Sequence, residues 1–282
     1  MTDFQPAPVL LLGATSATGT RLISGLLDAG AVLIAVTRKA PDFSRPNLTW
    51  LQQDPEHEYV RVQAQVVISA DAEALPAAAR QARAMPSLRR MIALSSSSVI
   101  FKQRSTDPDE RRAAQRLGRA EQELKTLAEK RGFDLTLLRP TLVYGGDGTS
   151  ALSAIRKWLE RRNWAPIAGR GLRQPVHADD LADLIRILVA RHQPGCETFD
   201  LGGGETLPYP EFVRRVGASA GVNPTLLRIP ARVITPLLRL AHRLGRFQSI
   251  TPAMVARQRM DLVVDDTKAR AQLGWNPRPF RP

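Results

Sequence analysis

A strand that turns abruptly into a helix through small residues constrains the fold of this chain more than any other feature. The segment 8–22 reads PVLLLGATSATGTRL, in which a buried-type apolar run ends at Gly13 and Gly19 follows six residues later. Apolar residues then recur at helical spacing on one face until Gly30, a residue type that ends helices in the left-handed conformation. The pattern predicts a βαβ unit whose first turn is built from small residues.

Further apolar runs alternate with helical stretches, and they lie at 31–36, 48–51, 66–69, 91–95 and 135–138. This alternation predicts an α/β fold, a Rossmann-type doubly wound parallel sheet with helices on both faces. From about residue 146 the chain contains stretches punctuated by Pro and Gly, which indicate a small C-terminal substrate lobe. We expect a dinucleotide-binding domain from 1–145 plus about 175–202, and a lobe from about 146–174 plus 203–282.

Composition bounds the class of protein. The 282 residues are 43% hydrophobic, enough for one large core without disulfides. Cys196 is the only cysteine, which excludes an intramolecular disulfide and a Cys-rich metal cluster and favours a cytoplasmic location. The N-terminus lacks a basic region before its short apolar run, so we expect neither a signal peptide nor a membrane span there. No set of His, Asp and Glu has metal-ligand spacing, and no metal is expected.

Charge is distributed unevenly along the chain. The net charge is +13, and residues 151–282 hold 21 basic and 11 acidic residues, a net of +10. Such a surface favours anionic partners, and a small anionic substrate is expected. The basic residues are scattered and few aromatics are interleaved with them, which argues against nucleic acid. The sequence leaves the oligomeric state open.

The glycine-containing turn is suited to phosphate. Glycines let the backbone approach a pyrophosphate, the helix N-terminus presents free N–H groups, and the Thr and Ser hydroxyls can add donors. A turn that merely permits tight packing of helix on strand is the alternative. The candidate residues of the turn are Gly13, Thr15, Ser16, Ala17, Thr18 and Gly19.

The end of the second strand bears on the choice of cofactor. An acidic residue there would bind the ribose hydroxyls of NAD, whereas this chain has Arg38 followed by Lys39. A guanidinium can pair with the 2′-phosphate of NADP through two hydrogen bonds. The sequence therefore favours NADP, with NAD possible, and two solvated charges as the alternative interpretation.

With these residues in view, nearly the whole chain resembles the short-chain dehydrogenase/reductase superfamily, in its extended and atypical branch of NAD-dependent epimerase/dehydratase-like proteins. The motifs that carry the resemblance are GATSATG, LQQDP, VVISA, ALSSSSVIF, LLRPTLVYG, PVHADDLADLI and DDTKARAQLGWNPRPF. The resemblance implies that Asp54 contacts the adenine, that Ser69 and Ala70 pass the cofactor ribose, and that Pro140 lines the nicotinamide.

The sequence departs from this family where the chemistry is performed. Active members pair a Tyr with a Lys four residues later, and none of the three tyrosines of this chain has such a partner. Alignment with the family's helix puts Gln115 at the Tyr position and Arg119 at the Lys position, where Arg119 could still bind the nicotinamide ribose or simply expose its charge. For the Ser/Thr role the candidates are Ser97 and then Ser96, although serines at a strand end also satisfy their own backbone.

Two readings of function follow. One is an NADP-dependent oxidoreductase or epimerase-like protein in which Ser97 polarises the substrate oxygen. The other is a non-catalytic dinucleotide-binding protein that serves as a redox sensor or as an assembly or accessory subunit.

Two further segments allow alternatives. Segment 226–246 places Leu, Ile and Val on one face and Arg on the other, which fits a helix packed on the lobe or a helix at a membrane surface. His177 stands near Asp179 and Asp180, where capping of the following helix by an aspartate is favoured over a metal site.

Overall fold

The computed structural model describes residues 8–39, 41–54, 58–146, 151–191, 193–243, 245 and 251–282. Its centre is a seven-stranded parallel sheet with the strand order β11-β6-β5-β4-β1-β2-β3. The expected doubly wound fold is confirmed, because the order reverses on either side of β1 as it does in dinucleotide-binding sheets. The strands are β1 (Val9–Leu12), β2 (Leu33–Thr37), β3 (Leu48–Gln52), β4 (Val66–Ser69), β5 (Arg90–Leu94), β6 (Asp134–Pro140) and β11 (Cys196–Leu201).

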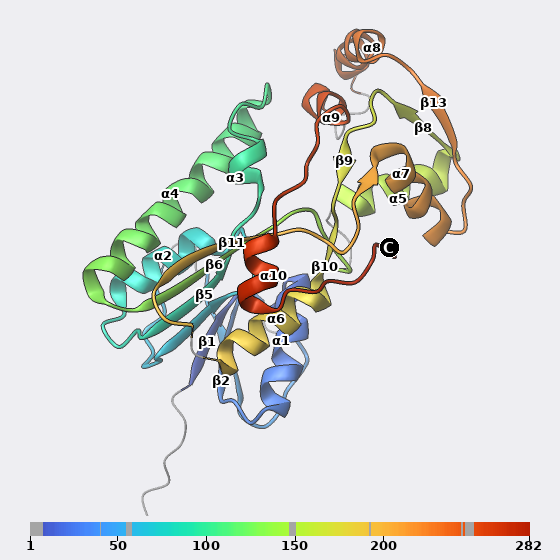
Figure 1. The fold of residues 1–282 in the computed structure, drawn as a ribbon. Coiled ribbons are helices and arrows are strands. Elements are labelled where there is room, and N and C mark those ends of the chain that lie inside the picture. Colours follow the sequence, from blue (N-terminus) through green and yellow to red (C-terminus); the bar gives the residue numbers. More distant parts are fainter. Residues whose placement is uncertain are drawn as a thin grey trace, which may run out of the picture.

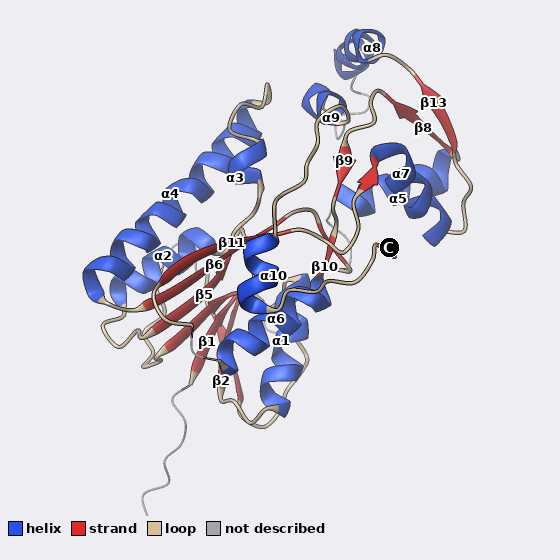
Figure 2. Cartoon of the chain, in the orientation of Figure 1, coloured by secondary structure: helices blue, strands red, loops and turns tan. Residues whose placement is uncertain are grey.

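Helices cover both faces of the sheet (Figures 1 and 2). On one face lie α1 (Ala17–Asp28), α6 (Ala178–Ala190) and α10 (Thr267–Leu273), and on the other lie α2 (Leu75–Ala84) and α4 (Pro108–Arg131). Successive residues of β1 alternate between the two cores, with Leu11 in the first and Leu10 in the second. Full burial on both sides explains why the central strands appear as continuous apolar runs.

A smaller lobe stands at one end of the sheet, at the upper right of Figure 1. Its aromatic and aliphatic core centres on Phe212, which stacks on Phe280 at 5.1 Å between ring centroids. Three short two-stranded sheets, two within the lobe and one at its junction with the core, complete the architecture. The remaining elements are α3 (Ser98–Phe101), β7 (Val143–Tyr144), α5 (Ala151–Arg162), β8 (Trp164–Ile167), β9 (Leu172–Arg173), β10 (Val176–His177), β12 (Leu207–Pro208), α7 (Tyr209–Ser219), β13 (Thr225–Arg228), α8 (Ala231–Arg243) and α9 (Pro252–Arg257).

The C-terminal segment does not follow the division expected from the sequence. The range 203–282 was assigned as a whole to the lobe, whereas α10 and Trp275 belong to the core formed by α1, α6 and the sheet. The indole N–H of Trp275 donates to the carbonyl oxygen of Gly202 at 2.8 Å, a buried hydrogen bond. The chain thus returns from the lobe to the core of the large sheet.

The expected capping of the helix after His177 by an aspartate is wrong. Helix α6 begins at Ala178, and its cap is His177, whose Nδ1 accepts the N–H of Asp179 at 3.1 Å. After α6 in the chain, Cys196 is the first residue of β11, which pairs with β6.

Candidate functional site

The first turn of the sheet brings strand and helix into close contact. Gly13 follows β1 with φ +71°, in the left-handed region that favours glycine. A Cβ on Gly19 would lie 2.1 Å from the carbonyl oxygen of Gly13, so only glycine fits at that position. Helix α1 therefore starts directly against the end of β1, and its N-terminus opens at the carboxyl edge of the sheet.

Ser16 caps α1 and ties it to β4. Its hydroxyl accepts the N–H of Gly19 at 3.0 Å and donates to the carbonyl oxygen of Ala70 at 3.0 Å. Because the hydroxyl of Ser16 already donates its proton to Ala70, the role of Ser16 is to hold the turn in place. The N–H groups of Ala17 and Thr18 are the first two of the helix and have no acceptor within it. Of the other turn residues, Thr15 is exposed and Thr18 is buried.

The ends of β2 and β3 lie at the same edge. The hydroxyl of Thr37 accepts the N–H of Lys39 at 3.2 Å and donates to its carbonyl oxygen at 2.8 Å, which fixes the backbone beyond β2. Arg38 and Lys39 are exposed, and among the described residues no carboxylate forms an ion pair with either side chain. Asp54 is half-buried and lies two residues beyond β3, the neighbour of β2 in the sheet.

At the end of β4, Ser69 and Ala70 are buried, and the next residue is an acid that the sequence interpretation missed. A Cβ on Gly13 would lie 3.0 Å from the Cβ of Asp71, which places this carboxyl group beside the turn. Burial raises the pKa of Asp71. The carboxylate of Asp71 accepts a hydrogen bond from the backbone N–H of Glu73, and this bond opposes the rise. The signal in the sequence was an acidic residue directly after a buried strand.

The serine run lies where β5 and β6 end side by side. The N–H of Ser97 donates to the carbonyl oxygen of Pro140 at 2.9 Å, so these two predicted residues are adjacent. Ser97 is buried and its side chain makes no capping bond, whereas the Ser96 hydroxyl accepts the N–H of Ser98 at 3.1 Å. The hydroxyl of Ser95 is buried without a hydrogen-bond partner among the described residues. This serine was not among the candidates.

The structure does not bring Arg119 to these residues. Helix α4 turns Ala114, Leu117 and Glu121 toward the sheet, whereas Gln115 and Arg119 are exposed. Arg119 lines a shallow surface hollow with Arg83 from the last turn of α2 and with residues between 122 and 130 of α4. The inward Glu121 instead holds Arg139 of β6 through two hydrogen bonds, one of 2.9 Å from Nε.

Charged groups join the core to the lobe near α3. The Glu110 carboxylate on α4 pairs with Arg257 of α9 and lies 3.8 Å from the Nζ of Lys102. Burial lowers the pKa of Lys102, and Glu110 opposes the shift. Behind them, Arg173 is buried with its guanidinium on backbone carbonyl oxygens, and burial lowers its pKa to about 10. Glu110 is thus the close carboxylate of Lys102 and Arg257, whereas the charge of Arg173 interacts with Arg257 and Asp261.

The residues around His177 act in packing. The carboxylate of Asp179 pairs with Arg21 of α1 and with Arg278 of the C-terminal segment, and the ring of His177 lies edge-on to Tyr144 at 4.8 Å. In the part of the chain that the structure describes, no group of three His, Cys, Asp or Glu side chains could hold a metal ion.

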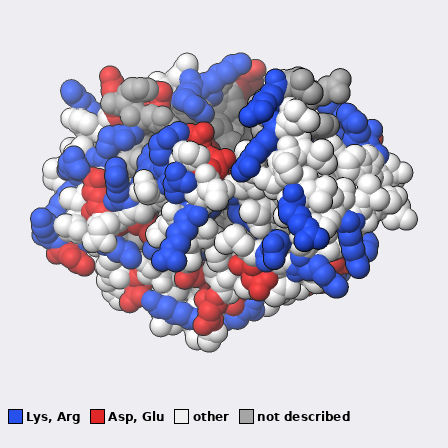
Figure 3. All heavy atoms as spheres, turned by 90° about the horizontal axis from the view of Figure 1, so that it is seen from above, with Lys and Arg blue, Asp and Glu red and all other residues white. Residues whose placement is uncertain are grey.

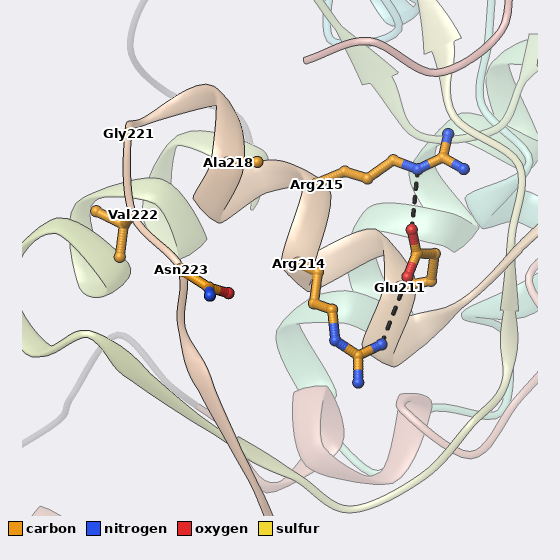
Figure 4. Close-up of a pocket in the computed structure, with 7 residues that line it drawn as sticks. All are labelled: Glu211, Arg214, Arg215, Ala218, Gly221, Val222 and Asn223. Atoms are coloured by element: carbon orange, nitrogen blue, oxygen red, sulfur yellow. Dashed lines mark hydrogen bonds and ion pairs between the residues drawn. The ribbon is translucent and has the colours of Figure 1, made fainter.

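A hollow on α7 is lined by ordinary surface groups (Figure 4). Glu211 accepts from Arg214 at 3.4 Å and from Arg215 at 3.2 Å, so the charges at its rim are paired within the helix. The carboxyl edge of the sheet, where the predicted cofactor residues lie, is the better candidate site.

Solved structures share this architecture over almost its whole length. The UDP-glucuronic acid 4-epimerase of Bacillus cereus in complex with NAD superposes with a TM-score of 0.70, covering 97% of this chain and 92% of that one at 14% identity. The UDP-glucose 4-epimerase of Thermotoga maritima shares this fold as well, at a TM-score of 0.68 and 17% identity over 97% of this chain and 94% of that one. At identities between 14% and 20%, the likeness to these solved structures is one of fold.

Curated relatives match part of the chain. An uncharacterized protein of Sinorhizobium fredii is 27% identical over 200 residues, 68% of this chain and 50% of that protein. The 4-hydroxy-2-methyl-3-oxo-4-farnesyl-3,4-dihydroquinoline-1-oxide ketoreductase of Stigmatella aurantiaca is 27% identical over 157 residues, 52% of this chain and 46% of that protein. The chain spans about half the length of the curated relatives it matches. No protein-family profile matches the sequence.

Proposed function

We propose that this protein binds NAD(P), with a preference for NADP, and acts as an oxidoreductase or epimerase-like enzyme on an anionic small molecule. The observation that carries the proposal is the turn from Gly13 to Gly19. Its glycines let α1 start directly against the end of β1, and the hydrogen bonds of Ser16 to both α1 and the end of β4 hold the helix N-terminus at the carboxyl edge of the sheet.

The residues present fit a pyrophosphate. The N–H groups of Ala17 and Thr18 would bind its oxygens, and the positive end of the α1 dipole would favour its charge. Asp54 would lie at the adenine, and Ser69, Ala70 and Pro140 along the ribose and nicotinamide. Asp71 lies beside this turn, and burial raises the pKa of its carboxyl group.

The preference for NADP rests on Arg38 and Lys39. Both are exposed at the end of β2, and their backbone is fixed by Thr37. In the part of the chain that the structure describes, no carboxylate neutralises them, so they are available to a 2′-phosphate.

A bound nicotinamide would supply hydride exchange with the substrate. The chain's own contribution is a hydrogen bond from Ser97, buried beside Pro140, to the substrate oxygen. Since Gln115 and Arg119 are exposed on α4, that helix offers neither the Tyr nor the Lys function, and the proton comes from solvent. The name of the Stigmatella relative, a ketoreductase, favours carbonyl reduction as the reaction.

The charge of the substrate is inferred from the junction of core and lobe. Lys102 and Arg257 lie there beside Glu110, and Arg173 interacts with Arg257 and Asp261. The excess of basic residues in 151–282, from which Arg173 and Arg257 come, favours an anionic group. The epimerase from Bacillus cereus with the same fold acts on UDP-glucuronic acid, itself an anion.

Titration with NADPH and with NADH, followed by nicotinamide fluorescence and by melting temperature, tests the proposal. The double variant Arg38→Ala, Lys39→Ala should bind NADPH about tenfold to a hundredfold more weakly and leave NADH affinity unchanged. The matched control Arg116→Ala, Lys130→Ala removes the same charge from the exposed surface of α4. Equal affinities of the double variant and wild type for NADPH would refute the assignment of these residues.

The exposed position of Arg119 favours a second candidate, a non-catalytic dinucleotide-binding subunit. It predicts NADPH binding without oxidation of NADPH by any carbonyl substrate in a broad screen. Steady turnover that is abolished in Ser97→Ala, with NADPH affinity retained, would eliminate this candidate and support the enzyme.

A further inference from the structure

Helix α8 carries an apolar stripe that the protein leaves uncovered. The helix packs on the lobe through Leu238, which is 7% exposed. On another side, Val233, Leu237 and Leu240 are 43%, 60% and 55% exposed. These three residues follow one another at spacings of four and three, so they form one continuous stripe along the helix.

A basic stripe runs beside the apolar one. Arg232, Arg239 and Arg243 are separated by seven and four residues, which places them on a common face about 100° around the helix from the apolar stripe. Residues 226–246 contain no Asp or Glu. Among the described residues, no carboxylate forms an ion pair with these three arginines. The outward side of α8 is therefore both apolar and positively charged.

The helix stands at the outer end of the lobe, at the top of Figure 1. Viewed from that end in Figure 3, Lys and Arg side chains are set among uncharged residues over the right-hand half, while acidic side chains are concentrated elsewhere on this face. A flat partner could therefore approach α8 without meeting a cluster of carboxylates.

We propose that α8 is an interfacial helix that anchors this protein to an anionic lipid bilayer, with Val233, Leu237 and Leu240 inserted among the lipids and the three arginines on the headgroups. An amphipathic helix with a basic polar face and low overall hydrophobicity lies in the plane of such an interface. Anionic lipids attract each arginine near the surface, and the apolar stripe supplies the insertion. The helix does not cross the bilayer: in the described residues no helix is long and apolar enough to do so.

Charge decides between a bilayer and a second copy of this chain. A twofold contact through α8 would bring the same surface of both copies together, and the arginine stripes would face one another without carboxylates in 226–246 to neutralise them. In an anionic bilayer, the lipid chains would contact the apolar stripe and the anionic headgroups would contact the arginines.

Co-sedimentation of the full-length protein with vesicles tests the proposal. We expect binding to equal parts of phosphatidylcholine and phosphatidylglycerol, and none to phosphatidylcholine alone. Arg232→Gln, Arg239→Gln, Arg243→Gln should lower the partition coefficient about 100-fold. Leu237→Glu should lower it more than about tenfold.

Control variants alter exposed residues elsewhere on the surface. Arg89→Gln, Arg116→Gln, Lys130→Gln removes three charges from the core surface, and Ile187→Glu changes an apolar residue of α6 that is 39% exposed. Both should bind vesicles like wild type, and unchanged melting temperatures of all variants would confirm that they fold.

Three outcomes would overturn the proposal. They are no binding to the anionic vesicles at low ionic strength, binding that Leu237→Glu leaves unchanged, and a wild-type dimer in solution that Leu237→Glu converts to a monomer. The second would indicate an electrostatic surface suited to an acidic protein, and the third a second copy. NADPH affinity is measured on the same variants and should not change, so this test is independent of the proposed function.

Discussion

Gly19→Ala tests the proposed phosphate-binding turn from Gly13 to Gly19 more directly than any other single change. The added Cβ would lie 2.1 Å from the carbonyl oxygen of Gly13 and 2.8 Å from both the carbonyl carbon and the oxygen of Ala14. All three atoms belong to the backbone, so no side chain can swing away. The closest contact falls about 1 Å or more short of ordinary separation, and α1 must therefore move away from the end of β1.

The expected losses follow from that displacement. Overpacking at a buried site costs about 3 kcal/mol, which lowers the melting temperature of a chain of this size by about 5–10 °C. The same movement withdraws the N–H groups of Ala17 and Thr18 from a bound pyrophosphate. Two charge-assisted hydrogen bonds weakened together should reduce NADPH affinity about 100-fold. Differential scanning fluorimetry and a fluorescence titration measure the two effects.

Gly118→Ala is the matched control. It lies inside α4, where an added Cβ would meet no atom within 4 Å, and alanine favours a helix by about 0.5–1 kcal/mol over glycine. The control should melt slightly above wild type and bind NADPH equally well. If Gly19→Ala melts and binds like wild type, the close approach of α1 to β1 has been misjudged and the phosphate assignment loses its basis.

Three further changes probe the framework of the site. Glu121→Gln should lower the free energy of unfolding by about 2 kcal/mol in urea denaturation, because it leaves the partly buried guanidinium of Arg139 without its main carboxylate. Trp275→Phe should lower the free energy of unfolding by about 1–2 kcal/mol in the same urea denaturation, because the carbonyl oxygen of Gly202 loses its buried hydrogen-bond donor. Burial lowers the pKa of His177 below 6.5, so below that pH the unfolded chain binds a proton that the folded chain does not, and stability falls as pH drops. Between about pH 7.5 and about pH 5.5 the melting temperature should fall less in His177→Gln than in wild type. An equal fall in both proteins would contradict the lowered pKa of His177.

The central strands could be predicted because burial on both faces leaves an unmistakable pattern. The apolar run at 66–69 coincides with β4. Gly13 directly follows β1, as expected. The edge strand β11 has the mixed sequence CETFDL, pairs with β6 alone and escaped detection. The one-residue accuracy needed to orient a helix also exceeds what a pattern provides, because each residue turns the side chain by about 100°. The alignment put Gln115 and Arg119 at the Tyr and Lys positions, and in the structure both residues are exposed.

The part of the site that the sequence could not predict depends on contacts between distant segments. Glu110 meets Arg257 across 147 positions, and Asp180 accepts the backbone N–H of Arg278 across 98. Such pairs bring the lobe to the edge of the sheet, and they follow from the path of the whole chain. The residues predicted to bind the cofactor differ in kind, since the turn at Gly13 and the basic pair at Arg38 are local to single strand ends. Part of their geometry is fixed by neighbours within a few positions, with Ser16 bonded to Gly19 and Thr37 bonded to Lys39, and the bond from Ser16 to Ala70 adds one contact across 54 positions. Cofactor binding is therefore open to inference from sequence, whereas substrate choice depends on the long-range contacts of the lobe.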